Sequence, residues 1–309
     1  MVAAARADAN MLRQRLRPGD LLLAALLGTA CALAAMRLPE HPELRGPLLF
    51  HGALLAGFLA FLALAVGGRI PRASELGVAA SIALVFTLYR SLGLLGFELH
   101  DRTFDAALSR IDTLLLGVDP SLWLDGRTPR KLVDVLSFVY LFYVGWVYLS
   151  IVLECFGREE KDREAFLLGL TLTYCLGYLG YLLVPAHGPI GFHAQDYAHP
   201  LAGGPVFQTM TRAVESQGGA IGAFPSLHVG GAVFLCLFDL RRNRMRGLTY
   251  LPVVPLVALS TVVLRFHYLV DWVGGIAVAV FALWVTPRAL AAWRRGTPRG
   301  APGISVEGA

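Results

Sequence analysis

Uncharged apolar runs of about twenty residues recur along most of this chain and constrain its fold more than any other feature. A helix needs about 20 mainly apolar residues to cross the hydrocarbon core of a bilayer. The 309-residue sequence is 56% hydrophobic and 16% charged, and its mean hydropathy of +0.59 is too high for an ordinary soluble domain. We therefore expect an all-α, polytopic membrane helix bundle with about eight transmembrane helices. The apolar windows cover residues 20–37, 48–66, 75–98, 132–153, 164–184, 223–239, 248–265 and 269–288.

Basic residues gather in alternate loops, which predicts the orientation of the chain in the membrane. The N-terminal segment, the second, fourth and sixth loops and the C-terminal segment hold 17 of the 27 Lys and Arg residues. Because Lys and Arg concentrate in cytoplasmic loops, we expect cytoplasmic termini and place the other loops on the outer face. The net charge of +5 is then a topology signal, and no aromatic-interleaved groove pattern indicates nucleic acid. The bias to Ala, Arg, Gly and Leu favours a bacterial inner membrane.

The first apolar run follows a basic stretch at residues 13–17, as in a secretory signal peptide. Several further spans follow, so an uncleaved first transmembrane helix is the preferred interpretation. A lipoprotein-type cleavage before Cys31 is a weaker alternative.

Two stretches between the apolar windows differ from simple connections. Residues 100–117 carry apolar side chains at helical spacing, with Asp101, Asp105 and Asp112 mostly on the opposite side. This pattern predicts a helix that lies in the membrane interface. Residues 185–222 are rich in Gly, Pro and His, and a compact bundle tolerates so long a loop mainly when it is functional.

The segment 265–271, Arg-Phe-His-Tyr-Leu-Val-Asp, opens the last apolar window. The i to i+4 spacing of His267 and Asp271 places them on one helix face within reach of each other. A carboxylate that accepts a hydrogen bond from one imidazole nitrogen leaves the other nitrogen as a nucleophile or base. A purely structural pair gives the same pattern, but an Asp inside an apolar span is expensive unless it is used. We therefore interpret the pair as catalytic.

The segment 223–228, Ala-Phe-Pro-Ser-Leu-His, opens the sixth apolar window. Free backbone N–H groups at a helix start form an anion site, and Pro225 fits there because it has no N–H to lose. Ser226 either donates a hydroxyl to an anion or caps the helix, and His228 follows within the first turn. Taken alone, a capped helix with a buried histidine explains this stretch equally well.

The two segments together indicate more than either alone. They place two histidines at the outer ends of two spans, one beside a carboxylate and one at an anion-binding helix start. This combination fits in-line attack on phosphorus with a general acid on the opposite side. The expected partner is a lipid phosphate or phosphodiester.

The pair Phe-Pro-Ser-x-His and His-Tyr-x-x-Asp, about 40 residues apart, resembles two signature motifs of the type 2 phosphatidic acid phosphatase superfamily. The resemblance is strongest to its inositol phosphorylceramide synthase-like branch. It implies that His267 is the nucleophile that forms a phosphohistidine, that Asp271 orients it, and that His228 is the acid. It further implies that Ser226 and the backbone after Pro225 hold phosphate oxygens.

The resemblance also implies a division of the chain into three parts. Residues 1–73 would be a basic segment with two extra transmembrane helices, and residues 291–309 a cytoplasmic tail. Residues 74–290 would be the catalytic six-helix membrane core, with outer loops at 99–130 and 185–222. Transfer and hydrolysis both stay open, because they differ only in whether an alcohol or water reaches the phosphohistidine.

The phosphate-binding residues depart from the pattern of the phosphatases in the superfamily. Thr261 stands where an arginine usually precedes the nucleophile by six residues, and Arg265 lies one turn nearer the surface on a similar face. The turn 184–189, Val-Pro-Ala-His-Gly-Pro, is similar to that of the synthase-like branch, with His187 where a basic residue is expected and Gly188 beside it. Arg90, inside the third window, either adds phosphate charge or snorkels to the interface.

Further histidines in the outer loop raise the question of a metal site. His187, His193, Asp196 and His199 lie in one stretch, but their spacing matches no compact metal site. Phosphohistidine chemistry needs no metal. We therefore expect neither a metal nor another cofactor.

Two other classes of protein remain as alternatives. An intramembrane serine protease would pair Ser226 with His267, but the proline directly before Ser226 and the lack of a Gly-x-Ser-Gly setting argue against it. A transporter or scaffold would use the histidines and Asp271 as a proton relay. It predicts coupled proton flux without turnover of a lipid phosphate.

Overall fold

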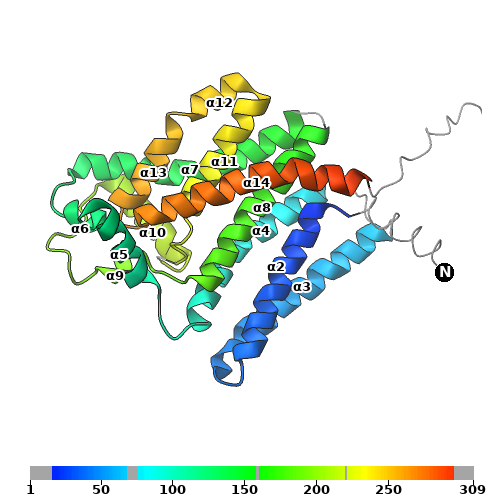
Figure 1. Ribbon diagram of the computed structural model, residues 1–309, viewed down its shortest axis with the longest axis horizontal. Helices are drawn as coiled ribbons and strands as arrows, with labels where there is room; N and C mark the ends of the chain where they lie inside the picture. The colour runs from blue at the N-terminus through cyan, green and yellow to red at the C-terminus, as the bar shows by residue number, and fades with distance from the viewer. Residues whose placement is uncertain (1–15, 68–74, 158–159, 220, 296–309) are drawn as a thin grey trace, which may run out of the picture.

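The computed structural model describes residues 16–67, 75–157, 160–219 and 221–295, and every regular element in these ranges is a helix (Figure 1). The prediction of an all-α bundle is confirmed. The residues before 16 and after 295, with most of the predicted N-terminal basic segment and cytoplasmic tail, lie outside the described part. The long helices are α2 (Pro18–Arg37), α3 (Arg45–Val66), α4 (Glu75–Glu98), α7 (Arg130–Gly157), α8 (Glu160–Leu183), α11 (Leu227–Arg242), α13 (Val253–Val263) and α14 (Leu269–Arg295).

Each of these helices overlaps one of the eight apolar windows. Within the described ranges, six segments are long and apolar enough to cross a membrane, which makes the chain a multi-pass membrane protein. Helix α11, at 16 residues, is shorter than a usual span. The seventh window is two helices, since α12 (Arg244–Tyr250) and α13 meet at Pro252. The six segments are Pro18–Arg37, Pro42–Val66, Arg130–Glu154, Asp162–Leu183, Arg244–Val263 and Leu269–Arg295.

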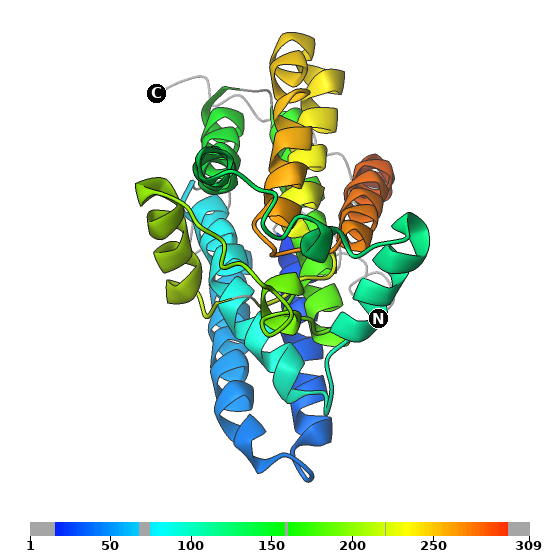
Figure 2. The same cartoon turned by 90° about the vertical axis from the view of Figure 1, so that its left-hand side faces the viewer.

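The helices are arranged around α11, which packs against α7, α8, α13 and α14. Helix α2 lies against α8 and α4, and α3 forms an antiparallel hairpin with α2 on the edge of the bundle (Figures 1 and 2). The two N-terminal helices are therefore additions to a core that surrounds α11.

Short helices gather at one end of this core. In Figure 1, α5 (Asp105–Leu116), α6 (Pro120–Trp123) and α9 (Pro189–Phe192) lie together at the left-hand end of the molecule. Helix α10 (Pro205–Ser216) packs along α7. The loops that carry these short helices are therefore folded back over one end of the bundle.

The outer faces of α7 and α14 expose large apolar side chains. Phe138 on α7 is 60% exposed and Val273 on α14 is 63% exposed. Apolar surface of this extent is rare on soluble monomers, whereas lipid is its natural environment. The surface therefore agrees with the membrane assignment that the spans give.

Glycines let neighbouring helices approach the start of α11 closely. A Cβ at Gly180 of α8 would overlap Pro225, and a Cβ at Gly275 of α14 would overlap the carbonyl oxygen of Ser226. At Gly230 it would lie 3.0 Å from the carbonyl oxygen of Gly275. Small residues at such crossings are the usual means of close helix packing in membranes. The backbone of the Pro-Ser-Leu-His segment is thereby fixed on two sides.

Candidate active site

His267 lies between α13 and α14, with one ring nitrogen engaged and the other free. Its Nδ1 is 2.8 Å from the carbonyl oxygen of Ala223 and 3.2 Å from Oδ2 of Asp271. Both neighbours accept hydrogen bonds, so Nδ1 carries the proton and Nε2 keeps its lone pair. Within the described residues Nε2 has no hydrogen-bond partner. The i to i+4 contact predicted from the sequence is therefore present and sets the tautomer of His267.

The loop that carries His267 is held by the end of α13. The N–H groups of Phe266 and His267 both donate to the carbonyl oxygen of Thr261, at 2.9 and 3.1 Å. Arg265 takes the left-handed conformation, with φ 66°, at the turn that ends the helix. Thr261, at the expected arginine position, is buried and accepts a hydrogen bond from the Trp272 indole, so its side chain supports α14.

His228 faces His267 from the first turn of α11. Their ring centroids are 6.0 Å apart, and Nε2 of His228 is buried without a hydrogen-bond partner in the described chain. Tyr140 of α7 stacks on the His228 ring at 4.1 Å, and Tyr143 lies 4.7 Å from it. The hydroxyl of Tyr143 also donates to the carbonyl oxygen of Leu227 at 2.8 Å. Two tyrosines thus fix the ring and the backbone of His228.

The two motifs are joined by a direct backbone contact. The N–H of Ser226 donates to the carbonyl oxygen of Asp271 at 3.0 Å, and Oδ2 of Asp271 accepts from the N–H of Tyr268 at 2.8 Å. The other carboxylate oxygen, Oδ1, is buried and unpaired among the described residues. Asp271 therefore holds both His267 and the start of α11 in one arrangement.

The start of α11 has the chemistry of an anion site. Pro225 follows Phe224 in a cis peptide bond, and Ser226 caps the helix by accepting from the N–H of Val229 at 3.4 Å. The N–H groups of Leu227 and His228 belong to the first turn, where a helix offers them no partner. Capping uses the Ser226 oxygen as an acceptor, and its O–H proton stays available as a donor.

The turn 185–190 packs against the His267 loop. Gly188 takes φ 76°, and a Cβ there would overlap the carbonyl oxygen of Phe266, so only glycine fits. The N–H of Ile190 donates to the carbonyl oxygen of Arg265 at 2.6 Å. His187 is exposed and stacks on Phe97 at 4.2 Å. The structure thus brings the predicted turn to the site, with Gly188 at the contact and the His187 ring turned to α4.

Arg265 is engaged within the protein. Its guanidinium pairs with Oδ1 of Asp125 at 2.9 Å, donates to the carbonyl oxygen of His199 at 3.3 Å and lies 3.6 Å from the centroid of the Tyr197 ring. Burial alone would raise the pKa of Asp125, but N–H donors from Ala198 and His199 together with Arg265 lower it. The pair joins the segment before α7 to the loop that carries His267.

Arg90 contacts the end of the 185–222 loop. It is exposed on α4 and donates to the carbonyl oxygen of Ser216 at 3.4 Å. A Cβ added at Gly218 would lie 3.6 Å from Cγ and 3.7 Å from Nε of Arg90, so the arginine side chain packs against this glycine. The structure therefore places Arg90 against the end of the long outer loop.

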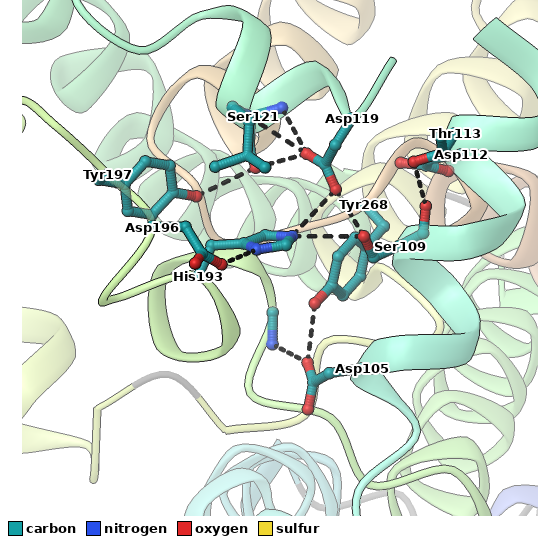
Figure 3. A network of polar contacts seen from close by, with 12 residues as sticks. Asp105, Ser109, Asp112, Thr113, Asp119, Ser121, His193, Asp196, Tyr197 and Tyr268 are labelled. Carbon is teal, nitrogen blue, oxygen red and sulfur yellow. Dashed lines mark hydrogen bonds and ion pairs between the residues drawn. The ribbon is translucent and has the colours of Figure 1, made fainter. Parts of the chain in front are cut away.

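His193 forms the centre of a second polar network (Figure 3). Its Nε2 is 3.1 Å from Oδ2 of Asp119 and its Nδ1 is 2.8 Å from Oδ2 of Asp196. Burial would raise the pKa of Asp119, but hydrogen bonds from Ser121 and Ser109, with His193 nearby, lower it on balance. No group of three or more His, Cys, Asp or Glu suited to a metal occurs among the residues described. The network fastens the loop before α7 to α9.

Several residues that contact the candidate site were not identified as site residues from the sequence. Tyr140 and Tyr143 lie in an apolar helix where nothing local marks them. Asp105 and Asp112 are buried and accept hydrogen bonds from the Gly188 turn and from the segment that follows His267. The sequence marks these two aspartates only by their spacing of seven residues. This spacing places both on one helix face, opposite exposed leucines. Asp101, by contrast, is exposed.

Fold and site together define a class of protein: a multi-pass helical membrane protein with two histidines close together at the start of a buried helix. The chain belongs to the PAP2 superfamily, whose profile matches residues 106–285. It is similar to a PA-phosphatase related-family protein of Dictyostelium discoideum, with 23% identity over 280 residues. The match covers 77% of this chain and 51% of that protein, so the chain spans about half the length of its relative. No solved structure matches significantly.

Proposed function

We propose that this protein is an integral membrane lipid phosphotransferase or phosphatase that works through a phosphohistidine on His267. One observation carries the proposal: the rings of His267 and His228 lie 6.0 Å apart between centroids, with Nδ1 of His267 engaged by Ala223 and Asp271 and Nε2 of His228 buried without a partner among the described residues. In-line transfer needs the nucleophile and the acid on opposite sides of one phosphoryl group, so the two imidazole rings must lie near each other. Membership of the PAP2 superfamily supports phosphatase-type chemistry.

In the first step, Nε2 of His267 attacks phosphorus. A nitrogen–phosphorus bond forms, the phosphorus–oxygen bond to the leaving group breaks, and protonated His228 gives its proton to the leaving oxygen. Asp271 and the carbonyl oxygen of Ala223 stabilise the positive charge that develops on His267.

In the second step, neutral His228 takes a proton from water or from an alcohol, whose oxygen attacks the phosphohistidine. The nitrogen–phosphorus bond breaks and His267 returns to its starting state. Water gives hydrolysis and an alcohol gives transfer. The same residues serve both reactions.

Phosphate oxygens would be held mainly by neutral donors. The first-turn N–H groups of α11 and the Ser226 hydroxyl lie next to His228, and the turn at Gly188 borders the His267 loop. Arg265 contributes charge only if its pair with Asp125 opens, and Arg90 contributes only if the loop end at Ser216 moves. His187 can meet a substrate head group from the exposed side of its turn.

The inositol phosphorylceramide synthase-like branch remains our proposal within the superfamily. The turn at residues 184–189 supports it because it is packed directly against the His267 loop. We also propose that the site lies on the outer face, because the positive-inside pattern puts both termini in the cytoplasm. The proposed catalytic core, residues 74–290, contains the region matched by the superfamily profile.

The test uses purified protein with phosphatidic acid, a monoester, and phosphatidylinositol, a diester. Product analysis with and without inositol, glycerol and sugar-alcohol acceptors separates transfer from hydrolysis. We expect turnover of one of these lipids and its loss in His267→Ala and His228→Ala. Equal turnover in the parent and both variants would overturn the proposal.

A further inference from the structure

Helix α5 contacts the 185–188 turn and the segment that follows His267, although it contributes no residue to the histidine pair. Asp105, in its first turn, is fully buried. Its Oδ1 accepts from the Gly188 N–H at 2.9 Å and from the Tyr268 hydroxyl at 3.0 Å. Its Oδ2 accepts from the His187 N–H at 3.1 Å. One carboxylate thus joins the 185–188 turn to the residue that follows His267.

Asp112, two turns further along the same face, makes a second attachment. Its Oδ2 accepts from the N–H of Leu269 at 2.6 Å and its Oδ1 from the N–H of Val270 at 2.9 Å. These N–H groups belong to the first turn of α14, where a helix has no internal partner for them. Asp112 therefore caps α14 from another helix, directly after the nucleophile's loop.

The segment after His267 is consequently held from two directions. Asp271 holds the N–H of Tyr268 from within α14, while Asp105 and Asp112 hold its hydroxyl and the next two N–H groups from α5. Each of these contacts involves a charged acceptor, which gives short and strong hydrogen bonds. Rotation of the His267 loop would break several of them at once.

We propose that Asp105 and Asp112 are positioning residues, which orient His267 relative to the Gly188 turn. They act through Tyr268 and the start of α14, and neither touches the reacting atoms. This inference rests on the proposed function. It extends that function by assigning the alignment of the nucleophile to a helix outside both motifs.

The opposite face of α5 explains why this helix can serve as a fixed reference. Leu114 and Leu115 are 74% and 69% exposed, as expected of a helix whose apolar side meets lipid. The acidic face turns inward and the apolar face turns outward. The predicted interfacial helix is therefore also the support of the site.

The decisive variants are Asp105→Asn and Asp112→Asn, with Asp101→Asn as matched control. Asp101 precedes the same helix, but its side chain is 76% exposed and it contacts neither motif. Asparagine keeps the size of the side chain, removes one acceptor oxygen and places N–H₂ donors against backbone N–H donors. We expect kcat to fall about 10- to 100-fold in the two variants, since small misplacements cost this much, with KM within about threefold. The control keeps the parent values.

The measurement must separate positioning from mere support of the fold. The substrate is phosphatidic acid or phosphatidylinositol, whichever the parent turns over faster. Rates are normalised to folded protein, and thermal unfolding in detergent is followed in parallel. Parent-like kcat per folded molecule in both Asn variants would overturn the inference, whatever their stability.

A milder variant keeps the inference testable if an Asn variant does not fold. Tyr268→Phe removes only the hydroxyl that Asp105 accepts. We expect a several-fold loss of kcat in Tyr268→Phe. In the double variant with Asp105→Glu, the loss should be smaller than the sum of the two single losses, because both changes break the contact between Tyr268 and Asp105. Parent-like kcat in Tyr268→Phe, or fully additive losses, would contradict the proposal.

His267→Ala in the same assay distinguishes the two levels of the account. If that variant stays active, the proposed function fails. If it is inactive while Asp105→Asn and Asp112→Asn keep the parent kcat, only the positioning role fails.

Discussion

Replacing Gly275 by alanine is expected to disable the site by separating α14 from α11. The added Cβ would overlap the carbonyl oxygen of Ser226 and lie 3.0 Å from the backbone nitrogen of Gly230. Both neighbours are backbone atoms, which cannot rotate aside as a flexible side chain can. The two helices that carry His267 and His228 must therefore move apart.

The expected size of the effect follows from this overlap. Overpacking of a tight contact costs about 1–3 kcal/mol of stability. A displacement near 1 Å between reacting groups can cost about 100-fold in rate, or roughly 2.7 kcal/mol in the barrier. We therefore expect Gly275→Ala to fold with reduced stability and to lose kcat/KM by about 100-fold.

The matched control is Gly145→Ala in α7. No atom lies within 4 Å of a Cβ built at Gly145, so this change adds helix propensity without a clash. Lipid phosphate turnover and thermal unfolding in detergent are measured for both variants. Gly275→Ala with the activity of Gly145→Ala would refute the claim that close packing of α11 and α14 aligns the histidines.

Three further changes test separate parts of the account. Asp271→Asn is expected to lower kcat by roughly 10²–10⁴-fold with little change in KM, because Nδ1 of His267 loses its carboxylate; a parent-like kcat would argue against a His–Asp pair. Tyr140→Leu removes the ring stacked on His228 and is expected to lower kcat about tenfold, whereas Tyr140→Phe keeps it; equal rates in the two variants would exclude a role for stacking. Asp119→Asn is expected to lower the free energy of unfolding by about 2–3 kcal/mol in thermal melts at pH 5–8. Folding lowers the pKa of Asp119 from 3.8, so its contribution to the free energy of unfolding is fully present above pH 3.8 and is lost as the pH falls through its lower pKa in the folded protein. A stability difference between parent and variant that stays unchanged in strong acid would contradict this.

The sequence predicted the bundle and the pair because their signals are local. Apolar windows marked all eight long helices, and the i to i+4 rule gave the contact between His267 and Asp271. The Pro-Ser pattern marked the start of α11, where Ser226 is indeed the cap.

The surroundings of the pair were not predictable from local pattern. Tyr140 meets His228 across 88 residues, and Asp105 meets Tyr268 across 163. The sequence suggested Arg265 as a phosphate ligand because nothing in it indicates the ion pair with Asp125, 140 residues away. Such contacts depend on how helices are packed, and hydrophobic periodicity does not specify that.

The acidic residues of the 100–117 segment show the same limit. Alternation of polar and apolar faces correctly indicated an amphipathic helix, here α5. It did not indicate that the polar face is turned toward the protein, where Asp105 and Asp112 are buried. Polar side chains on an interfacial helix can form hydrogen bonds with water or with backbone N–H groups of the protein. Which of the two they contact depends on how the helix packs in the fold.

The most direct test of the central claim is the covalent intermediate itself. Purified protein is mixed with ³²P-labelled phosphatidic acid or phosphatidylinositol, quenched in base, and the labelled residue is located by mass spectrometry. We expect an acid-labile, base-stable phosphoryl group on His267 that is absent in His267→Ala and forms more slowly in His228→Ala. Turnover with no label on His267, or with the label on Ser226 or another residue, would contradict it.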